Sequence, residues 1–188
     1  MRRQTNPLAL GPSSIFGLLL SVFAFNNASL GQSLGVGWIG ARPSPATCMS
    51  FSPNGRLIAV GRENGRCEIW DYERQEPLAE LVGNDGRVTV ALFAPDGNRV
   101  LTGGNRGTAT LWDVGTAEAL ERFEYERPDG VSAQFGITDA TFAPDGRSAL
   151  ITSFGRTIRH WSCDSGTELG QLDGHQGPVL SATLSPSE

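Results

Sequence analysis

Residues 92–113, LFAPDGNRVLTGGNRGTATLWD, decide the fold of this chain. The stretch contains the turn 94–97 (APDG) and ends on Trp112 and Asp113. The same frame occurs twice more, from the turn 52–55 (SPNG) to Trp70 and Asp71, and from the turn 143–146 (APDG) to Trp161 and Ser162. The turn proline and the tryptophan are 17 positions apart in all three copies. Three matches at one spacing indicate a repeat protein.

Each copy divides into four short strands, because apolar residues alternate with polar ones between turns rich in Gly, Asn and Asp. In the first copy the predicted strands are 47–51, 57–61, 66–71 and 78–82. In the second they are 88–93, 99–103, 108–113 and 119–124, and in the third 138–142, 148–152, 157–161 and 169–172. The chain is therefore predicted to be all-β, with hairpin-linked antiparallel strands.

The Pro-Asp-Gly turn, the Ile/Leu-Trp-Asp ending and the pair Gly174 and His175 resemble the WD repeats of the β-propeller fold. The resemblance covers the chain from about residue 36 to its end. It implies blades of four antiparallel strands, in which each repeat supplies three strands of one blade and the fourth strand of its neighbour. Most members of that family are rigid platforms for other proteins. The resemblance thus implies a non-enzymatic scaffold for protein–protein interaction, without a cofactor.

The repeats are predicted at about 47–87, 88–136 and 137–178, with a partial repeat at 179–188, in a WD-repeat region that spans 32–188. The turn prolines Pro53 and Pro95 are 42 positions apart, as are Pro144 and Pro186, whereas Pro95 and Pro144 are 49 apart. The seven additional residues fall in the segment 126–136, which we expect to be a loop between two blades. Inserted loops cost little free energy and often carry function.

The ends of this region predict an incomplete ring. Residues 36–39 align with 78–81 as an outer strand, and 179–184 resemble a first strand whose turn begins at 185. About three blades are then complete, below the roughly four of the smallest closed propellers. Because open blades expose apolar faces and strand edges, we expect copies of the chain to associate and complete one another's blades. The alternative is a truncated propeller fragment without independent activity.

Residues 1–31 have the pattern of a secretory signal peptide. Arg2 and Arg3 precede the uncharged apolar run 15–25 (IFGLLLSVFAF), and small residues suit a cleavage site after Gly31. The run is about half the roughly 20 residues that a membrane-spanning helix needs. The sequence predicts a secreted or periplasmic (extracytoplasmic) protein, with no integral membrane segment once the signal is cleaved. The alternatives are an uncleaved membrane anchor and a cytoplasmic protein with a misassigned start.

The charge of the chain argues against nucleic-acid binding. The formal net charge is −5, and all 15 basic residues are arginines. A nucleic-acid surface needs clustered positive charge, so no nucleic-acid partner is predicted.

Cys48 and Cys67 are expected on the first and third strands of one blade, roughly 9–10 Å apart. A disulfide needs Cα atoms within about 7 Å, so none is predicted within the chain, whose third cysteine is Cys163.

The resemblance also implies a polar chain in each blade: a His before the first strand, a Ser or Thr on the second, an Asp in the next turn, and the Trp. In the second repeat Trp112 and Thr102 are in place, while Asn84 stands at the His position and Arg106 at the Asp position. The first repeat has Val60 at the Ser/Thr position. The structural repeat residues implied are Trp70, Asp71, Thr102, Trp112, Asp113, Trp161, Gly174 and His175. Because no polar chain is complete, we expect the blades to depend mainly on apolar packing.

No residue set predicts catalysis or a metal site. Residues 160–164 (HWSCD) contain the residue types of a nucleophile system, but consecutive strand residues point to opposite faces of a sheet. No Cys/His pair has the spacing of metal ligands. A propeller-borne hydrolase is therefore the least supported interpretation.

Arginines precede each tryptophan strand, at Arg62 and Arg66, at Arg106, and at Arg156. In the family these turns share one rim of the ring with the loops that join blades. Because a guanidinium binds carboxylates in a bidentate manner, we expect this rim to contact an acidic segment of another protein, whose identity the sequence does not disclose. The alternative is that the arginines are solvated turn residues.

Overall fold

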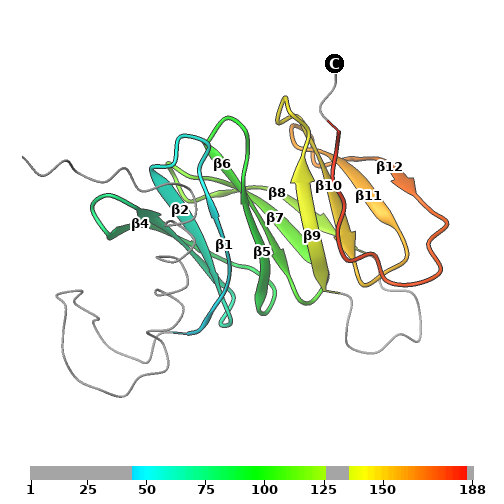
Figure 1. Cartoon of the computed structure of the whole chain (residues 1–188), viewed down its shortest axis with the longest axis horizontal. Helices are drawn as coiled ribbons and strands as arrows, with labels where there is room; N and C mark the ends of the chain where they lie inside the picture. Colours follow the sequence, from blue (N-terminus) through cyan, green and yellow to red (C-terminus); the bar gives the residue numbers. More distant parts are fainter. Residues whose placement is uncertain (1–43, 126–135, 186–188) are drawn as a thin grey trace, which may run out of the picture. The chain divides into compact units, whose positions relative to one another are not determined.

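A computed structural model describes residues 44–125 and 136–185 (Figure 1). Twelve strands in these two ranges form three antiparallel sheets of four strands each. The described part of the chain contains no helix long and apolar enough to cross a membrane. The predicted signal peptide, the predicted outer strand 36–39 and most of the inserted loop lie outside the described residues.

The strands of each sheet follow one another along the chain (Figure 1). The first sheet contains β1 (Ala46–Phe51), β2 (Leu57–Arg62), β3 (Arg66–Asp71) and β4 (Glu76–Val82). The second contains β5 (Val88–Phe93), β6 (Arg99–Gly104), β7 (Thr108–Asp113) and β8 (Ala119–Glu124). The third contains β9 (Ile137–Phe142), β10 (Ser148–Ser153), β11 (Ile158–Ser162) and β12 (Glu168–Leu172). The all-β class and the four-stranded blades predicted from the sequence are confirmed, with the largest boundary error at β4, predicted from 78 and observed from Glu76.

Pro-Asp-Gly turns join the first two strands of the second and third sheets, and a Pro-Asn-Gly turn joins those of the first. Gly97 has φ of 73°, a left-handed conformation that glycine adopts without strain. Asp96 holds the turn because its Oδ1 accepts a hydrogen bond from the Asn98 N–H at 2.8 Å. Burial would raise the pKa of Asp96, but this bond and the Arg99 guanidinium outweigh it and lower the pKa. The Asp96 side chain thus stabilises the turn that closes this hairpin.

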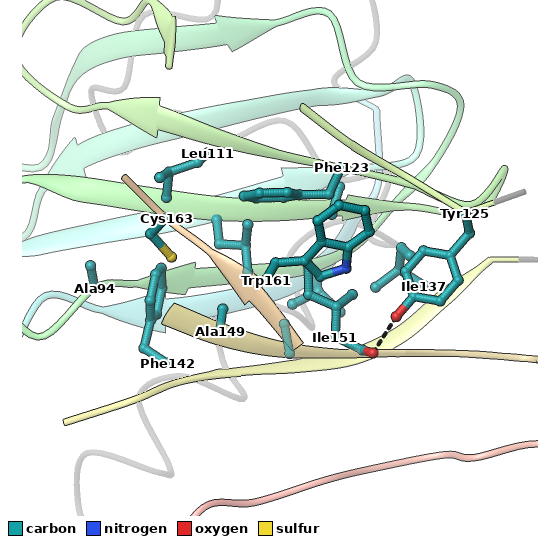
Figure 2. Close-up of a cluster of buried hydrophobic side chains, with 14 residues drawn as sticks. Ala94, Leu111, Phe123, Tyr125, Ile137, Phe142, Ala149, Ile151, Trp161 and Cys163 are labelled. Carbon is teal, nitrogen blue, oxygen red and sulfur yellow. Dashed lines mark hydrogen bonds between the residues drawn. The ribbon is translucent and has the colours of Figure 1, made fainter. Parts of the chain in front are cut away.

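Two hydrophobic cores lie between consecutive sheets. Between the first and second sheets, Ile69 and Leu81 are fully buried against Val100 and Trp112. Figure 2 shows the core between the second and third sheets, where Phe123 lies with its ring centroid 5.4 Å from that of Trp161. The second sheet therefore packs one apolar face on the first sheet and the opposite face on the third.

The sheets approach one another closely at two glycines. A Cβ built on Gly61 would lie 2.6 Å from Val88 Cγ1, and one on Gly103 would lie 2.6 Å from Ile137 Cγ2. A threonine next to this contact donates to the backbone of the next sheet: Thr47 to the Val88 carbonyl, and Thr89 to the Ile137 carbonyl at 2.7 Å. The repeated sequence thus builds the same joint between sheets twice.

The outer strand of each sheet carries a β-bulge beside the tryptophan strand. The additional residue is a leucine each time, and Leu78, Leu120 and Leu169 are 51%, 46% and 57% exposed. A bulge bends and twists an edge strand, which hinders its pairing with another chain. The outer edges of the three sheets are therefore poor sites for strand addition.

The predicted strand 179–184 is not a strand in the structure, because no neighbouring strand pairs with it among the described residues. The segment nevertheless lies alongside β9 (Figure 1), since Thr138 Oγ1 donates to the Val179 carbonyl at 2.7 Å. This bond repeats the joint that Thr47 and Thr89 make with β5 and β9. Residues 179–184 thus occupy the place that the first strand of a following sheet would take.

Candidate functional site

The second sheet contains a polar chain built on Trp112. Its indole Nε1 donates to Thr102 Oγ1 at 2.7 Å, and Thr102 donates in turn to Asn84 Oδ1. Asn84 Nδ2 then donates to the Gly65 carbonyl at 3.0 Å, which lies in the first sheet's β2–β3 turn. Thr102 is fully buried, so these bonds satisfy groups that water cannot reach. Asn84, which stands where the resemblance implies a histidine, thus connects the second sheet's polar chain to the first sheet.

The first sheet supports its tryptophan in a different way. Trp70 Nε1 donates to Glu68 Oε2 at 2.8 Å, and the same oxygen is 2.6 Å from Arg62 Nη2. Arg62 Nη1 also donates to the Ser44 carbonyl at 3.1 Å. Arg62, predicted as part of an exposed rim, is therefore only 7% exposed and belongs to the interior of its blade. The prediction is wrong for this residue because Arg62 ends β2, where its side chain reaches Glu68 instead of solvent.

Glu68 is the residue that the sequence prediction missed. It precedes Trp70 by two positions on β3, and residues two apart on a strand lie on the same face. The sequence alone could have predicted this contact, because a carboxylate two positions before the repeat tryptophan can accept a hydrogen bond from its indole.

The third sheet has neither arrangement. Ile151 occupies the strand position of Thr102, and Trp161 Nε1 is buried without a hydrogen-bond partner in the described part of the chain. Figure 2 shows Tyr125 beside this core, with its hydroxyl donating to the Ile151 carbonyl. The Arg159 guanidinium lies 4.8 Å from the centre of the Tyr125 ring. Burial raises the pKa of Tyr125 well above its ordinary value, so the ring is neutral.

The remaining predicted structural residues lie at chain turns. Asp71 Oδ1 accepts from the Arg74 N–H at 2.9 Å, and Asp113 Oδ1 accepts from the Thr116 N–H at 2.8 Å. Both aspartates therefore shape the turn that leads to the outer strand. Gly174 has φ of 115°, and His175 is exposed.

The three turns before the tryptophan strands hold equivalent places. Each is tied by a backbone hydrogen bond to the entry of its own sheet's first strand: Glu63 to Pro45 at 2.9 Å, Asn105 to Arg87 at 2.9 Å, and Phe154 to Gly136 at 3.1 Å. The loop between the first and second sheets also reaches both neighbouring turns. A Cβ on Gly65 would lie 2.8 Å from the Gly86 carbonyl oxygen, and a Cβ on Gly86 would lie 2.3 Å from Asn105 Oδ1. Turns and joining loops thus share one end of the sheets.

Three of the four predicted rim arginines are exposed at this end, and we call Arg66, Arg106 and Arg156 the arginine rim. Arg66 lies 2.7 Å from Glu80, with side chains 51% and 41% exposed. Arg106 lies 3.2 Å from Asp85, with side chains 63% and 36% exposed. No ion pair of Arg156 occurs among the described residues. The rim therefore presents two solvent-accessible ion pairs and one guanidinium without an ion-pair partner in that part of the chain.

The residues 160–164 do not form a nucleophile system. His160 is half-buried on the face of β11 opposite Trp161, whereas Cys163 is buried in the core between the second and third sheets. Burial raises the pKa of the Cys163 thiol to about 11, which keeps it protonated at neutral pH. All three cysteines are free. No cluster of three metal-ligating side chains occurs in the described residues.

Comparison with known proteins agrees with this geometry. Residues 38–71 and 75–113 match the family model "WD domain, G-beta repeat". The chain is also similar to WD repeat and FYVE domain-containing protein 2 of Mus musculus and of Homo sapiens, at 36% identity over 56 residues in each case. That match covers 28% of this chain and only 14% of the length of each curated relative. Two matched WD repeats thus account for residues 38–71 and 75–113, and the third four-stranded sheet has the same topology beyond them.

Proposed function

We propose that this protein is an interaction module whose arginine rim binds an acidic segment of another protein. One observation carries the proposal: three exposed arginines stand at equivalent turns of three consecutive sheets. The repeat positions them along one end of the sheets, so one extended chain can reach all three. Arginine suits this role because its planar guanidinium binds a carboxylate in a bidentate manner.

The existing ion pairs favour exchange with a partner. Exposed pairs such as Arg66–Glu80 and Arg106–Asp85 contribute only about 0–1 kcal/mol each, so a partner's carboxylates replace them at little cost. Arg156 needs no such exchange within the described residues. Removal of one rim charge should therefore weaken binding slightly, whereas reversal of two charges should weaken it strongly.

The test uses a fluorescein-labelled glutamate-rich peptide and fluorescence anisotropy at low ionic strength. The double variant Arg106→Glu/Arg156→Glu should bind at least about tenfold more weakly than the unmodified chain, since two attractive contacts become repulsive. The matched control is Arg56→Glu/Arg147→Glu, which reverses two exposed arginines in the turns at the opposite ends of the strands. Equal loss in both double variants would indicate a general charge effect and would reject the rim as the binding site.

We further propose that residues 1–31 direct export and are then removed. The proposal is supported by the order of charged, apolar and small residues at the N-terminus. N-terminal sequencing of the protein from the extracytoplasmic fraction should begin at Gln32. A start at Met1 in the membrane fraction would indicate an uncleaved anchor, and recovery only from the cytoplasm would reject export.

A further inference from the structure

The chain uses one kind of interface twice between its own sheets. We call the face that a sheet turns to the preceding sheet its near face, and the opposite one its far face. The far face of the first sheet (Ala59, Cys67, Ile69, Leu81) packs on the near face of the second (Ala91, Phe93, Val100, Trp112), and all eight residues are at most 6% exposed. The far face of the second sheet packs in the same way on Ala140, Phe142, Ala149 and Trp161 of the third.

The far face of the third sheet and the near face of the first sheet are incompletely covered. On the far face of the third sheet, Leu172 is 55% exposed, although Leu81 and Phe123 at the same strand position are fully buried. On the near face of the first sheet, Tyr72 is 38% exposed. The other residues of that near face, Met49, Phe51, Ile58 and Trp70, are half-buried. These four match the aromatic and aliphatic pattern of the two buried near faces.

Residues 179–184 cover only the inner part of the third sheet's far face. Val179 packs on Leu150 and Ile158, and Ser181 Oγ donates to Asp139 Oδ2 at 2.6 Å. The Ala182 N–H donates to the same oxygen at 3.2 Å. Leu180 points away and is 67% exposed. The segment thus lies where a first strand would lie, but the rest of the face has no sheet on it in the described residues.

We propose that a second copy of this chain docks the near face of its first sheet on the far face of the third sheet, and that residues 179–184 compete for the same place. In the docked state the second copy's β1 takes the position of 179–184. Thr138 then donates to the Ala46 carbonyl of the second copy, as Thr47 donates to Val88 and Thr89 to Ile137. The chain itself carries both halves of this interface, which it already forms twice between its own sheets.

The number of sheets sets the stoichiometry. The described residues of two copies contribute six complete sheets, which falls within the roughly four to eight blades of closed propellers, whereas those of three copies would give nine. A head-to-tail contact that closes on itself forms a discrete assembly instead of a filament. The expected product is therefore a dimer with two identical interfaces.

The far face of the third sheet is more polar than the far faces of the first two sheets, so a second copy should bind it reversibly. His160 stands at the strand position of Ile69 and Leu111, and Thr152 stands at that of Gly61 and Gly103. Thr152 is hydrogen-bonded to Thr138 at 2.7 Å. These polar side chains reduce the apolar area available to a docked sheet, and binding is weaker when less apolar surface is buried. Competition by 179–184 then decides the balance between monomer and dimer.

A mixing experiment with full-length chains tests the interface. Tyr72→Glu blocks the near face and Leu172→Glu blocks the far face, and both changes are at exposed positions, so each variant should keep its fold and its far-ultraviolet circular dichroism spectrum. In sedimentation velocity each variant alone should be monomeric, and an equimolar mixture should form a one-to-one complex through the intact pair of faces. The unmodified chain should form a concentration-dependent dimer. A mixture that stays monomeric, or an unmodified chain that is monomeric at every concentration, would overturn the proposal.

A second pair of variants tests the competing segment. Val179→Asp removes the apolar anchor of 179–184, so the competing segment is destabilised and the dimer should form at least about tenfold more tightly. Leu180→Asp changes the exposed neighbour and should leave the dimer constant unchanged. Weaker dimerisation of Val179→Asp would show that the segment supports the contact instead of opposing it. The two faces lie apart from the arginine rim, so either proposal can fail without the other.

Discussion

Trp112 donates its indole N–H to Thr102 Oγ1 at 2.7 Å, and neither other sheet repeats this bond. The first sheet gives its tryptophan the carboxylate of Glu68, and the third leaves Trp161 Nε1 unpaired in the described residues. Three blades of one topology thus place the same indole in three polar environments. Trp112 and Trp161 are buried in the cores between sheets, whereas Trp70 is half-buried.

Thr102→Val tests the polar chain of the second sheet. The change conserves shape but removes the acceptor of Trp112 and the donor to Asn84, which leaves buried polar groups unpaired. The free energy of unfolding should fall by about 1–3 kcal/mol in urea titration. The control is Thr141→Val, a half-buried strand threonine whose hydroxyl has no hydrogen bond among the described residues. A loss no larger than that of the control would show that the chain contributes nothing to stability.

Glu68→Gln tests the buried ion pair of the first sheet. The amide can still accept from Trp70, but Arg62 becomes a buried cation without a counter-charge. Breaking a buried pair costs about 3–5 kcal/mol, and the partial exposure of Glu68 should reduce this to about 2–3 kcal/mol. Glu80→Gln breaks the exposed pair with Arg66 and should cost less than about 1 kcal/mol. Equal losses of unfolding free energy in the two variants would mean that the Arg62 side chain becomes solvent-exposed once its partner is neutral.

Gly103→Ala tests the close approach of the second and third sheets. The added methyl would meet Ile137 Cγ2 at 2.6 Å, so the sheets must separate or Ile137 must shift. Thermal unfolding should reveal a loss of about 1–3 kcal/mol. Gly170→Ala, in strand β12, is the matched control because nothing lies within 4 Å of its new Cβ. If Gly103→Ala is as stable as Gly170→Ala, the joint between the sheets is looser than the distance indicates.

Alkaline pH should destabilise the fold through Cys163. Burial raises the pKa of its thiol from 9.0 to about 11, so the unfolded chain loses this proton first as the pH rises. The stabilising contribution is complete below pH 9.0 and is lost as the pH rises toward about 11. Urea midpoints measured from pH 8 to pH 11 should therefore decrease less steeply in Cys163→Ala than in the unmodified chain. Parallel pH profiles would contradict the assignment to this thiol.

The regular part of the fold was predictable because it repeats. Three equal spacings between proline and tryptophan located all twelve strands. The family pattern paired Thr102 with Trp112 but gave Asn84 only as a departure from the family histidine. These features depend on local sequence, so a single sequence was sufficient to predict them.

The departures from the repeat were not predictable in the same way. Arg62 was expected in solvent because its turn is polar, but its orientation depends on a partner six positions later. Residues 179–184 have the sequence of a strand, yet a strand needs a neighbour to pair with. Both errors concern contacts between elements, which a residue pattern does not specify.

The most direct test of the arginine rim is nuclear magnetic resonance of the arginine Nε–H groups during titration with a glutamate-rich peptide. The signals of Arg66, Arg106 and Arg156 should shift together and saturate at one peptide concentration, because one segment contacts three equivalent turns. The signals of Arg56 and Arg147, in the turns at the opposite ends of the strands, should stay in place. Shifts at Arg56 and Arg147, or no saturable shift at the rim, would contradict the proposed function.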